Sequence, residues 1–177
     1  MLAAGVALFA AGVWIYNRLV SDRNLAREGF ADIDVQLKRR ADLVPQLVEA
    51  VRGYAAYEKA TLSAVTELRA NAAGFGPEPG EARFGAEREL GAKLKTLLLL
   101  QENYPQLKAD ANFRDLSAKL VDTEDQLQYA RRFYNGAVKQ YRTRLESFPH
   151  VIVARAFAFE PLPFFETGER DAVKVTL

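Results

Sequence analysis

The stretch NFRDLSAKLVDTEDQLQYARRFYNGAVKQYRTRLESFP, residues 112–149, decides the fold through the spacing of its apolar side chains. Residues three and four apart alternate without a slip along it, and all but two of them are apolar or aromatic: Phe113, Leu116, Leu120, Thr123, Leu127, Ala130, Tyr134, Ala137, Tyr141, Arg144 and Phe148. A mean spacing of about 3.5 residues keeps such side chains on one helix face, as in left-handed coiled-coil packing. We therefore predict a long helix from Asn112 to Phe148, closed by Pro149.

The same alternation runs through the earlier part of the chain, from Phe30 to Leu68. Pro45 lies inside it, and a proline within a helix removes one hydrogen bond and collides with the preceding turn. We therefore predict a kink near Leu43 and Val44. The pattern keeps its phase across the proline, which favours a kink over a break.

A segment rich in glycine and proline, NAAGFGPEPG at residues 71–80, should end this first helix. A second helix is predicted over 81–103, where Leu97–Leu100 should be buried on more than one side, and Pro105 should end it or bend it sharply. Short connections between long helices make neighbours antiparallel. The predicted fold is all-α, an up-and-down antiparallel bundle of three long helices, counted as four segments because of the Pro45 kink.

The first sixteen residues, MLAAGVALFAAGVWIY, carry no charged side chain. A secretory signal peptide would need a basic start and a small-residue cleavage site, and a buried core helix would show one polar face. A membrane anchor over 1–16 fits best, with Trp14 and Tyr16 as interfacial aromatics. Such a helix reaches ~24 Å against a hydrocarbon core of ~30 Å, which predicts bilayer thinning, snorkelling or an earlier start codon.

Basic residues concentrate after this segment, beginning with Arg18, Arg23 and Arg27. The positive-inside rule then predicts that the rest of the chain lies in the cytoplasm. Ala3, Ala7 and Ala11 have the small-residue spacing that allows helix pairing, and hence a homo-oligomer, although an alanine-rich span often shows it by chance.

Charge and composition exclude several classes of function. Lys and Arg number 24 against 23 Asp and Glu, so the chain has no basic field for nucleic acid. It has no cysteine and a single histidine, His150, which is better explained as a surface or capping residue than as a ligand. No glycine-rich phosphate loop or nucleophile motif is present. We expect no metal, no cofactor and no catalytic set.

Polar residues within or beside the apolar seams are the candidate site: Arg39, Arg40, Asp42, Glu58, Arg69, Glu102, Glu124, Arg131 and Asn135. One hypothesis pairs Glu102 with Glu124 as the acid and base of a hydrolase. The alternative, which we favour, is a structural network of salt bridges and hydrogen bonds that fixes the register of the helices.

The end of the chain is aromatic and broken by prolines. Residues 151–159 are predicted as a short helix or an extended segment. Four aromatic side chains need cover, most simply from the bundle, and are also candidates for a partner surface: Phe157, Phe159, Phe164 and Phe165. We predict a bundle over 17–165 and a flexible tail over 166–177.

Several segments, in order along the chain, resemble the LemA family of bacterial membrane proteins. They include DVQLKRRADLVPQLVEAV (34–51), LLLLQENYPQLKADANFRDL (97–116), DTEDQLQYARRFYNGAVKQY (122–141) and FPHVIVARAFAFEPLPFF (148–165). The resemblance implies one N-terminal membrane segment followed by a helical bundle, in the bacterial inner membrane. It implies no agreed activity, because members are linked variously to peptide display, sensor-kinase signalling and magnetosome formation.

The function expected from all of this is a membrane-anchored, non-catalytic scaffold or adaptor that contacts other membrane or signalling proteins. Two alternatives stay open. One is a lipid-binding or membrane-remodelling structural protein, although a near-neutral charge disfavours it. The other is the hydrolase that would use Glu102 and Glu124.

Overall fold

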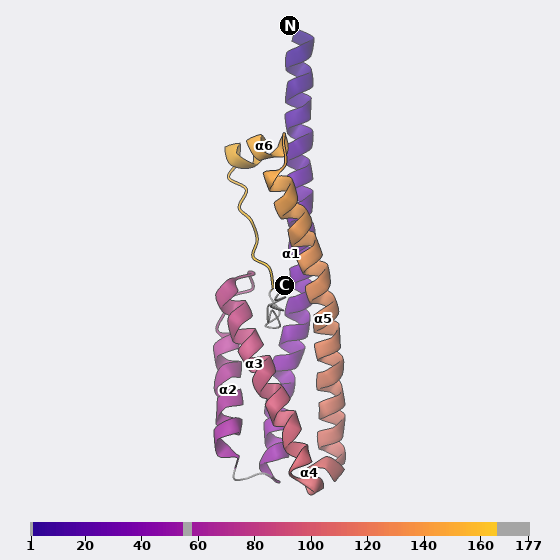
Figure 1. Cartoon of the computed structure of the whole chain (residues 1–177), viewed down its shortest axis with the longest axis vertical. Coiled ribbons are helices and arrows are strands. Elements are labelled where there is room, and N and C mark those ends of the chain that lie inside the picture. Colours follow the sequence, from indigo (N-terminus) through magenta and orange to yellow (C-terminus); the bar gives the residue numbers. More distant parts are fainter. Residues whose placement is uncertain (1, 55–57, 166–177) are drawn as a thin grey trace, which may run out of the picture. The chain divides into compact units, whose positions relative to one another are not determined.

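The computed structural model describes residues 2–54 and 58–165, and within them the chain forms helices and turns with no strand (Figure 1). The elements are α1 (Leu2–Arg52), α2 (Lys59–Ala73), α3 (Glu81–Leu99), the 3-10 turn η1 (Leu100–Glu102), α4 (Pro105–Ala109), α5 (Ala111–Glu146) and α6 (His150–Ala156). The all-α prediction is confirmed, and α5 lies where the sequence placed it. Of the two alternatives for residues 151–159, the short helix describes 151–156. The predicted flexible tail, 166–177, lies outside the described residues.

The division of the first long helix differs from the prediction. The helix runs unbroken through Pro45, as the phase of the pattern indicated, but it ends at Arg52, and α2 begins only at Lys59. Gly53 follows the last helical residue, and a basic residue followed by glycine is a common helix ending. The apolar residues keep the same spacing of three and four across this turn, so the pattern alone does not predict a helix end there.

Pro45 is accommodated by a side chain from α2. A proline leaves the carbonyl four residues earlier without its helical donor, and here that carbonyl belongs to Ala41. Arg69 fills the gap, because its Nε donates to the Ala41 oxygen at 2.8 Å. Pro45 itself lies on the exposed side of the helix.

We expect Arg69→Met to lower the free energy of unfolding by about 1–2 kcal/mol, because the Ala41 carbonyl loses its donor. In a Pro45→Ala background the backbone amide supplies that donor, so the same substitution should cost clearly less. Thermal and urea denaturation of the four variants in detergent forms the double-mutant cycle. Equal costs in the two backgrounds would contradict this role of Arg69.

Two compact units make up the chain, and each is described by itself. Among the described residues, the first unit combines 2–39 with 122–164, and the second combines 40–54 and 58–121 with Phe165. Helices α1 and α5 contribute to both.

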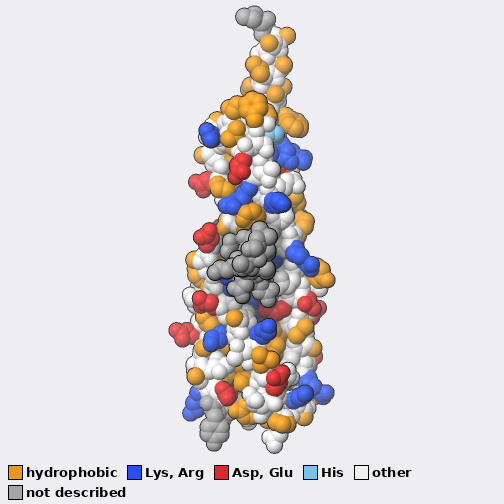
Figure 2. All heavy atoms as spheres, viewed as in Figure 1, with side chains coloured by type: hydrophobic (Ala, Val, Ile, Leu, Met, Phe, Trp, Pro, Cys, Tyr) orange, Lys and Arg blue, Asp and Glu red, His pale blue; other side chains and the backbone are white. Residues whose placement is uncertain are grey.

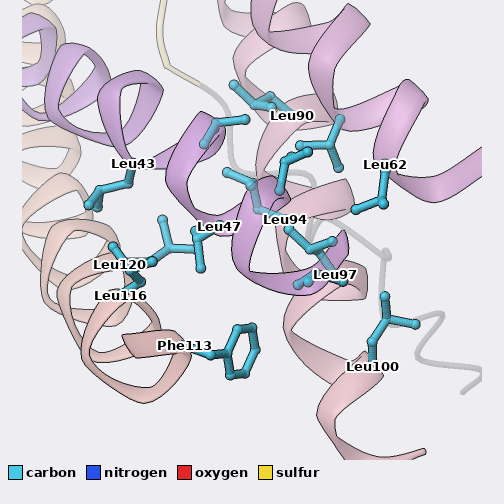
Figure 3. Packing of buried hydrophobic residues seen from close by; sticks show 14 of the residues in the cluster. Leu43, Leu47, Leu62, Leu90, Leu94, Leu97, Leu100, Phe113, Leu116 and Leu120 are labelled. Atoms are coloured by element: carbon cyan, nitrogen blue, oxygen red, sulfur yellow. The ribbon is translucent and has the colours of Figure 1, made fainter. Parts of the chain in front are cut away.

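The core of the second unit is built from leucine side chains of α1, α2, α3 and α5 (Figure 3). Leu47, Leu94, Leu97 and Phe113 are fully buried in it. The leucine run behaves largely as predicted, since Leu97 and Leu100 are buried and Leu98 packs against the cluster. Leu99 is the exception and is half exposed.

Asp110 forms the N-terminal cap of α5 in this unit. Its Oδ1 accepts the backbone N–H of Phe113 at 2.7 Å, three residues on, as a capping aspartate does. Its Oδ2 accepts the hydroxyl of Tyr54 at 2.9 Å. The Phe113 amide and then the Tyr54 hydroxyl lower the pKa of Asp110, and Asp110 in turn raises the pKa of Tyr54. The cap thus ties the start of α5 to the turn after α1.

In the first unit α1 and α5 pack closely along their length. Gly29 permits a close approach, because a Cβ there would lie 3.2 Å from the backbone Cα of Tyr134. Phe30 and Tyr134 pack beside it with ring centroids 5.8 Å apart. Beyond the packed region the beginning of α1 is exposed, and this helix is long and apolar enough to cross a membrane.

Candidate functional site

The most deeply buried charge of the second unit is Arg40 of α1, which is 0% exposed. Its guanidinium forms an ion pair with the carboxylate of Glu87 on α3 and also donates to the Glu87 backbone oxygen at 2.9 Å. Gly91, one turn further along α3, makes room for it, since a Cβ there would lie 3.1 Å from Nη1 of Arg40. The pair therefore joins α1 to α3 inside the unit.

The other predicted polar residues of this unit lie nearer the surface. Glu58 accepts the hydroxyl of Tyr104 at 3.2 Å. Arg69 donates to the Ala41 carbonyl, which Pro45 leaves without a helical donor. Asp42 is exposed, and its backbone oxygen accepts from the Gln46 side chain at 3.2 Å. Glu102 is exposed in η1.

In the first unit, exposed Arg39 forms an ion pair with Asp122 at 3.3 Å. Arg131 is buried, and Glu124 and Asn135 are half buried, each with an interaction of its own. The prediction from the sequence thus included residues that contact a neighbouring helix, such as Arg40, and exposed residues, such as Asp42 and Glu102. It did not select several of the partners, namely Glu87, Tyr104 and Asp122.

A second buried cluster was missed altogether. Asp22 of α1 is 3% exposed, accepts from Nε of Arg144 and from Nε2 of Gln140 at 3.0 Å, and has Arg18 at 3.9 Å. Part of the signal was present in the sequence, because Arg144 was counted as a polar member of the last seam, whereas Asp22 lies before Phe30, where the first pattern begins. This cluster joins α1 to α5 within the first unit.

A structural network stays our prediction for these polar groups. Glu102 and Glu124, the pair suggested for a hydrolase, belong to different units. Within the described residues no three His, Asp or Glu side chains gather so that they could hold a metal ion. His150 is half buried, and neither ring nitrogen has a hydrogen-bond partner among the described residues, so it does not act as a cap. Its ring instead lies near that of Trp14, at 6.2 Å between centroids.

The segment after α6 is held against the first unit by two tyrosines of α5. The hydroxyl of Tyr134 donates to the Pro163 oxygen at 2.7 Å, and that of Tyr141 donates to the Glu160 oxygen at 3.0 Å. Burial raises the pKa of both tyrosines, so each stays a neutral donor. These two bonds fix the path of the chain over residues 160–163.

The aromatic residues of this segment are mostly covered, which corrects the prediction of a partner surface there. Phe165 is fully buried in the second unit, with its ring centroid 4.2 Å from that of Phe84. Phe164 lies under the guanidinium of Arg142, at 4.8 Å, and Phe159 packs on the core of the first unit. The alternative prediction, cover by the bundle, describes them better. Phe157 remains 63% exposed.

Exposed apolar side chains do gather on another face of the first unit. Val35 of α1 and Tyr129 and Phe133 of α5 are each about half exposed or more, and they line a hollow that is open to solvent. The guanidinium of Arg132 lies 4.6 Å from the centre of the Tyr129 ring. We call Val35, Tyr129 and Phe133 the apolar stripe.

A second group of exposed apolar residues lies where the exposed part of α1 meets α6. Figure 2 shows hydrophobic side chains along the free end of α1 and over α6. Tyr16 contacts Phe157 edge-on at 4.9 Å and Phe159 at 5.4 Å. Ile15, directly before Tyr16, and Leu19, one turn after Ile15, are buried against α5 and α6. The protein core of the first unit thus begins at Ile15.

Comparison with known proteins identifies relatives of this chain by sequence. The model of the LemA family matches residues 29–177. Protein LemA of Metamycoplasma hominis is 25% identical over 90% of this chain and 72% of its own length. Magnetosome protein MamQ 2 of Paramagnetospirillum magneticum is 22% identical over 91% of this chain and 68% of its own. Magnetosome protein MamQ of Magnetospirillum gryphiswaldense is 23% identical over 85% and 64%.

Proposed function

The chain belongs to the LemA family, and on that premise we propose that it is a membrane-anchored, non-catalytic adaptor. It would hold another membrane protein against the apolar stripe of its first unit. The observation that carries this proposal is the pairing, in one unit, of an apolar helix able to span a membrane with a separate exposed apolar face. The names of the relatives describe no reaction, which supports the non-catalytic part.

The anchor in this proposal is the exposed beginning of α1, where Leu2, Val6, Leu8 and Phe9 all face outward. Side chains of this kind are stable in lipid and costly in water. The basic residues that follow it favour a cytoplasmic location for both units, at the inner membrane of a bacterium.

The partner face in this proposal is the apolar stripe, because its three side chains remain about half exposed or more in the described part of the chain. Aromatic residues with an arginine beside them are typical of protein-binding centres. A partner in the same membrane would meet this face at high effective concentration, since both are confined to the bilayer.

Photo-crosslinking in cells tests the proposal. A photoreactive amino acid at position 35 or 129 should capture one or two membrane proteins reproducibly, identified by mass spectrometry. The matched control is position 139, an exposed lysine of α5 away from the stripe, which should capture neither. Crosslinks only to a second copy of the chain, or only to lipid, would overturn the adaptor proposal, and the latter would support a lipid-binding role.

A further inference from the structure

Apolar side chains recur on the outer face of α6 with helical spacing. Ile152 is 59% exposed, and Ala156, four residues further along α6, is exposed as well. Residues four apart lie on the same face of a helix. Phe148, two residues before the helix, is 80% exposed, and Phe157, directly after it, is 63% exposed. These four exposed residues lie within ten positions, and we call them the apolar edge.

The inner face of α6 is firmly packed, so this edge is held in place. Ala154 is buried with Ile15 and Leu19 of α1 and with Tyr141 and Leu145 of α5. After the helix, Ala158 adopts the left-handed conformation with φ 50° and turns the chain toward the anchored residues 160–163. The outer face therefore does not result from a loosely attached helix.

The position of α6 along α1 suggests what covers this edge. Trp14 lies near His150, and Tyr16 contacts Phe157, so α6 lies beside the point where α1 changes from exposed to buried. Tryptophan and tyrosine are enriched at the level of lipid headgroups. Figure 1 shows α6 lying crosswise to α1, so a spanning α1 places α6 along the membrane surface.

The charges around α6 also suit a headgroup layer. Arg155 is exposed on the helix, and Arg18 is half exposed on α1 one turn beyond Trp14. Glu146 and Glu160 are exposed nearby, so the surroundings are mixed in sign. Binding should therefore rest on apolar burial and depend only weakly on anionic lipid.

We propose that α6, with Phe148 and Phe157, is an interfacial element that inserts its outer edge into the surface of the bilayer that α1 spans. This inference rests on the proposed membrane anchor. A single spanning helix can turn about its own axis, and a second contact at the membrane surface restricts that rotation. The element would therefore fix which way the apolar stripe faces.

Spin labelling of the full chain in liposomes tests the inference, because the protein has no cysteine and accepts single labels. Labels are introduced by Ile152→Cys and, separately, by Phe148→Cys, both at exposed positions where the fold is expected to tolerate them. Lys139→Cys on α5 is the matched control. Each label's collisions with oxygen and with a water-soluble nickel complex give its depth, and circular dichroism checks the fold.

At positions 148 and 152 we expect collisions with nickel to be several-fold rarer than at 139, corresponding to insertion by about 5–10 Å. In the same samples brominated lipids should quench Trp14, the single tryptophan. Quenching of Trp14 with water-like labels at 148 and 152 would overturn the interfacial element and leave the anchor standing. Absence of Trp14 quenching would overturn the anchor itself. Nickel protection that persists without lipid would indicate a protein contact and likewise overturn the inference.

Discussion

Replacing Arg40 with methionine is expected to lower the free energy of unfolding by about 3–5 kcal/mol. The substitution leaves the Glu87 carboxylate buried opposite an apolar side chain, and it also removes the donor to the Glu87 backbone oxygen. A buried charge without its partner retains the full cost of its lost hydration. Urea denaturation of the detergent-solubilised chain, followed by circular dichroism, measures the change.

The neighbouring arginine provides a matched control. Arg39 forms an ion pair too, with Asp122, but both side chains are about half exposed, so Arg39→Met should cost less than about 1 kcal/mol. The double variant Arg40→Met with Glu87→Met should regain most of the loss, because an apolar pair of similar size replaces the ionic one. If Arg40→Met cost no more than Arg39→Met, the buried pair would not hold α1 and α3 together.

The Arg40–Glu87 pair shows which part of a buried contact the sequence predicts and which part it does not. Arg40 occupies a seam position of the first pattern, so an interhelical role was predictable. Glu87 lies three residues before Leu90 and seven before Leu94, on the same buried face of α3, a signal that was overlooked. The pairing of the two depends on the relative register of α1 and α3, and a single sequence contains no direct measure of register.

The helix boundaries show a different limit. Prolines and glycines at 71–80, Pro105 and Pro149 predicted three ends well, because each residue type restricts the backbone locally. The turn after Arg52 was missed because the apolar spacing stays in phase across it. Local chemistry, a basic residue and then Gly53, was the better guide there.

The aromatic end of the chain was predictable in composition but not in placement. Four phenylalanines clearly needed cover or a partner, and the sequence left both open. The bundle covers most of this segment because Tyr134 and Tyr141 donate hydrogen bonds to its backbone oxygens. Such bonds to the main chain are invisible in a sequence, since any residue type can supply the accepting carbonyl.

The second large effect is expected at Asp22, where Asp22→Ala should lower the free energy of unfolding by about 2–3 kcal/mol. The substitution removes the acceptor of both Arg144 and Gln140 from the buried contact between α1 and α5. The cost is smaller than at Arg40 because the Arg144 side chain is 22% exposed and regains some hydration. Asp32→Ala, at an exposed position of α1, is the matched control and should lie within about 0.5 kcal/mol of the parent protein.

Because of where Asp22 lies, Asp22→Ala should also have a local effect on the end of α5. Arg144 lies in the last turn of α5, six residues before α6 begins, so the Asp22 contact secures the helix end from which α6 continues. Hydrogen exchange should therefore accelerate over residues 144–156 in Asp22→Ala more than over the rest of α5. A uniform increase along α5 would mean that Asp22 contributes only to global stability. A confined increase would make Asp22 the residue that ties α6 to the rest of the first unit.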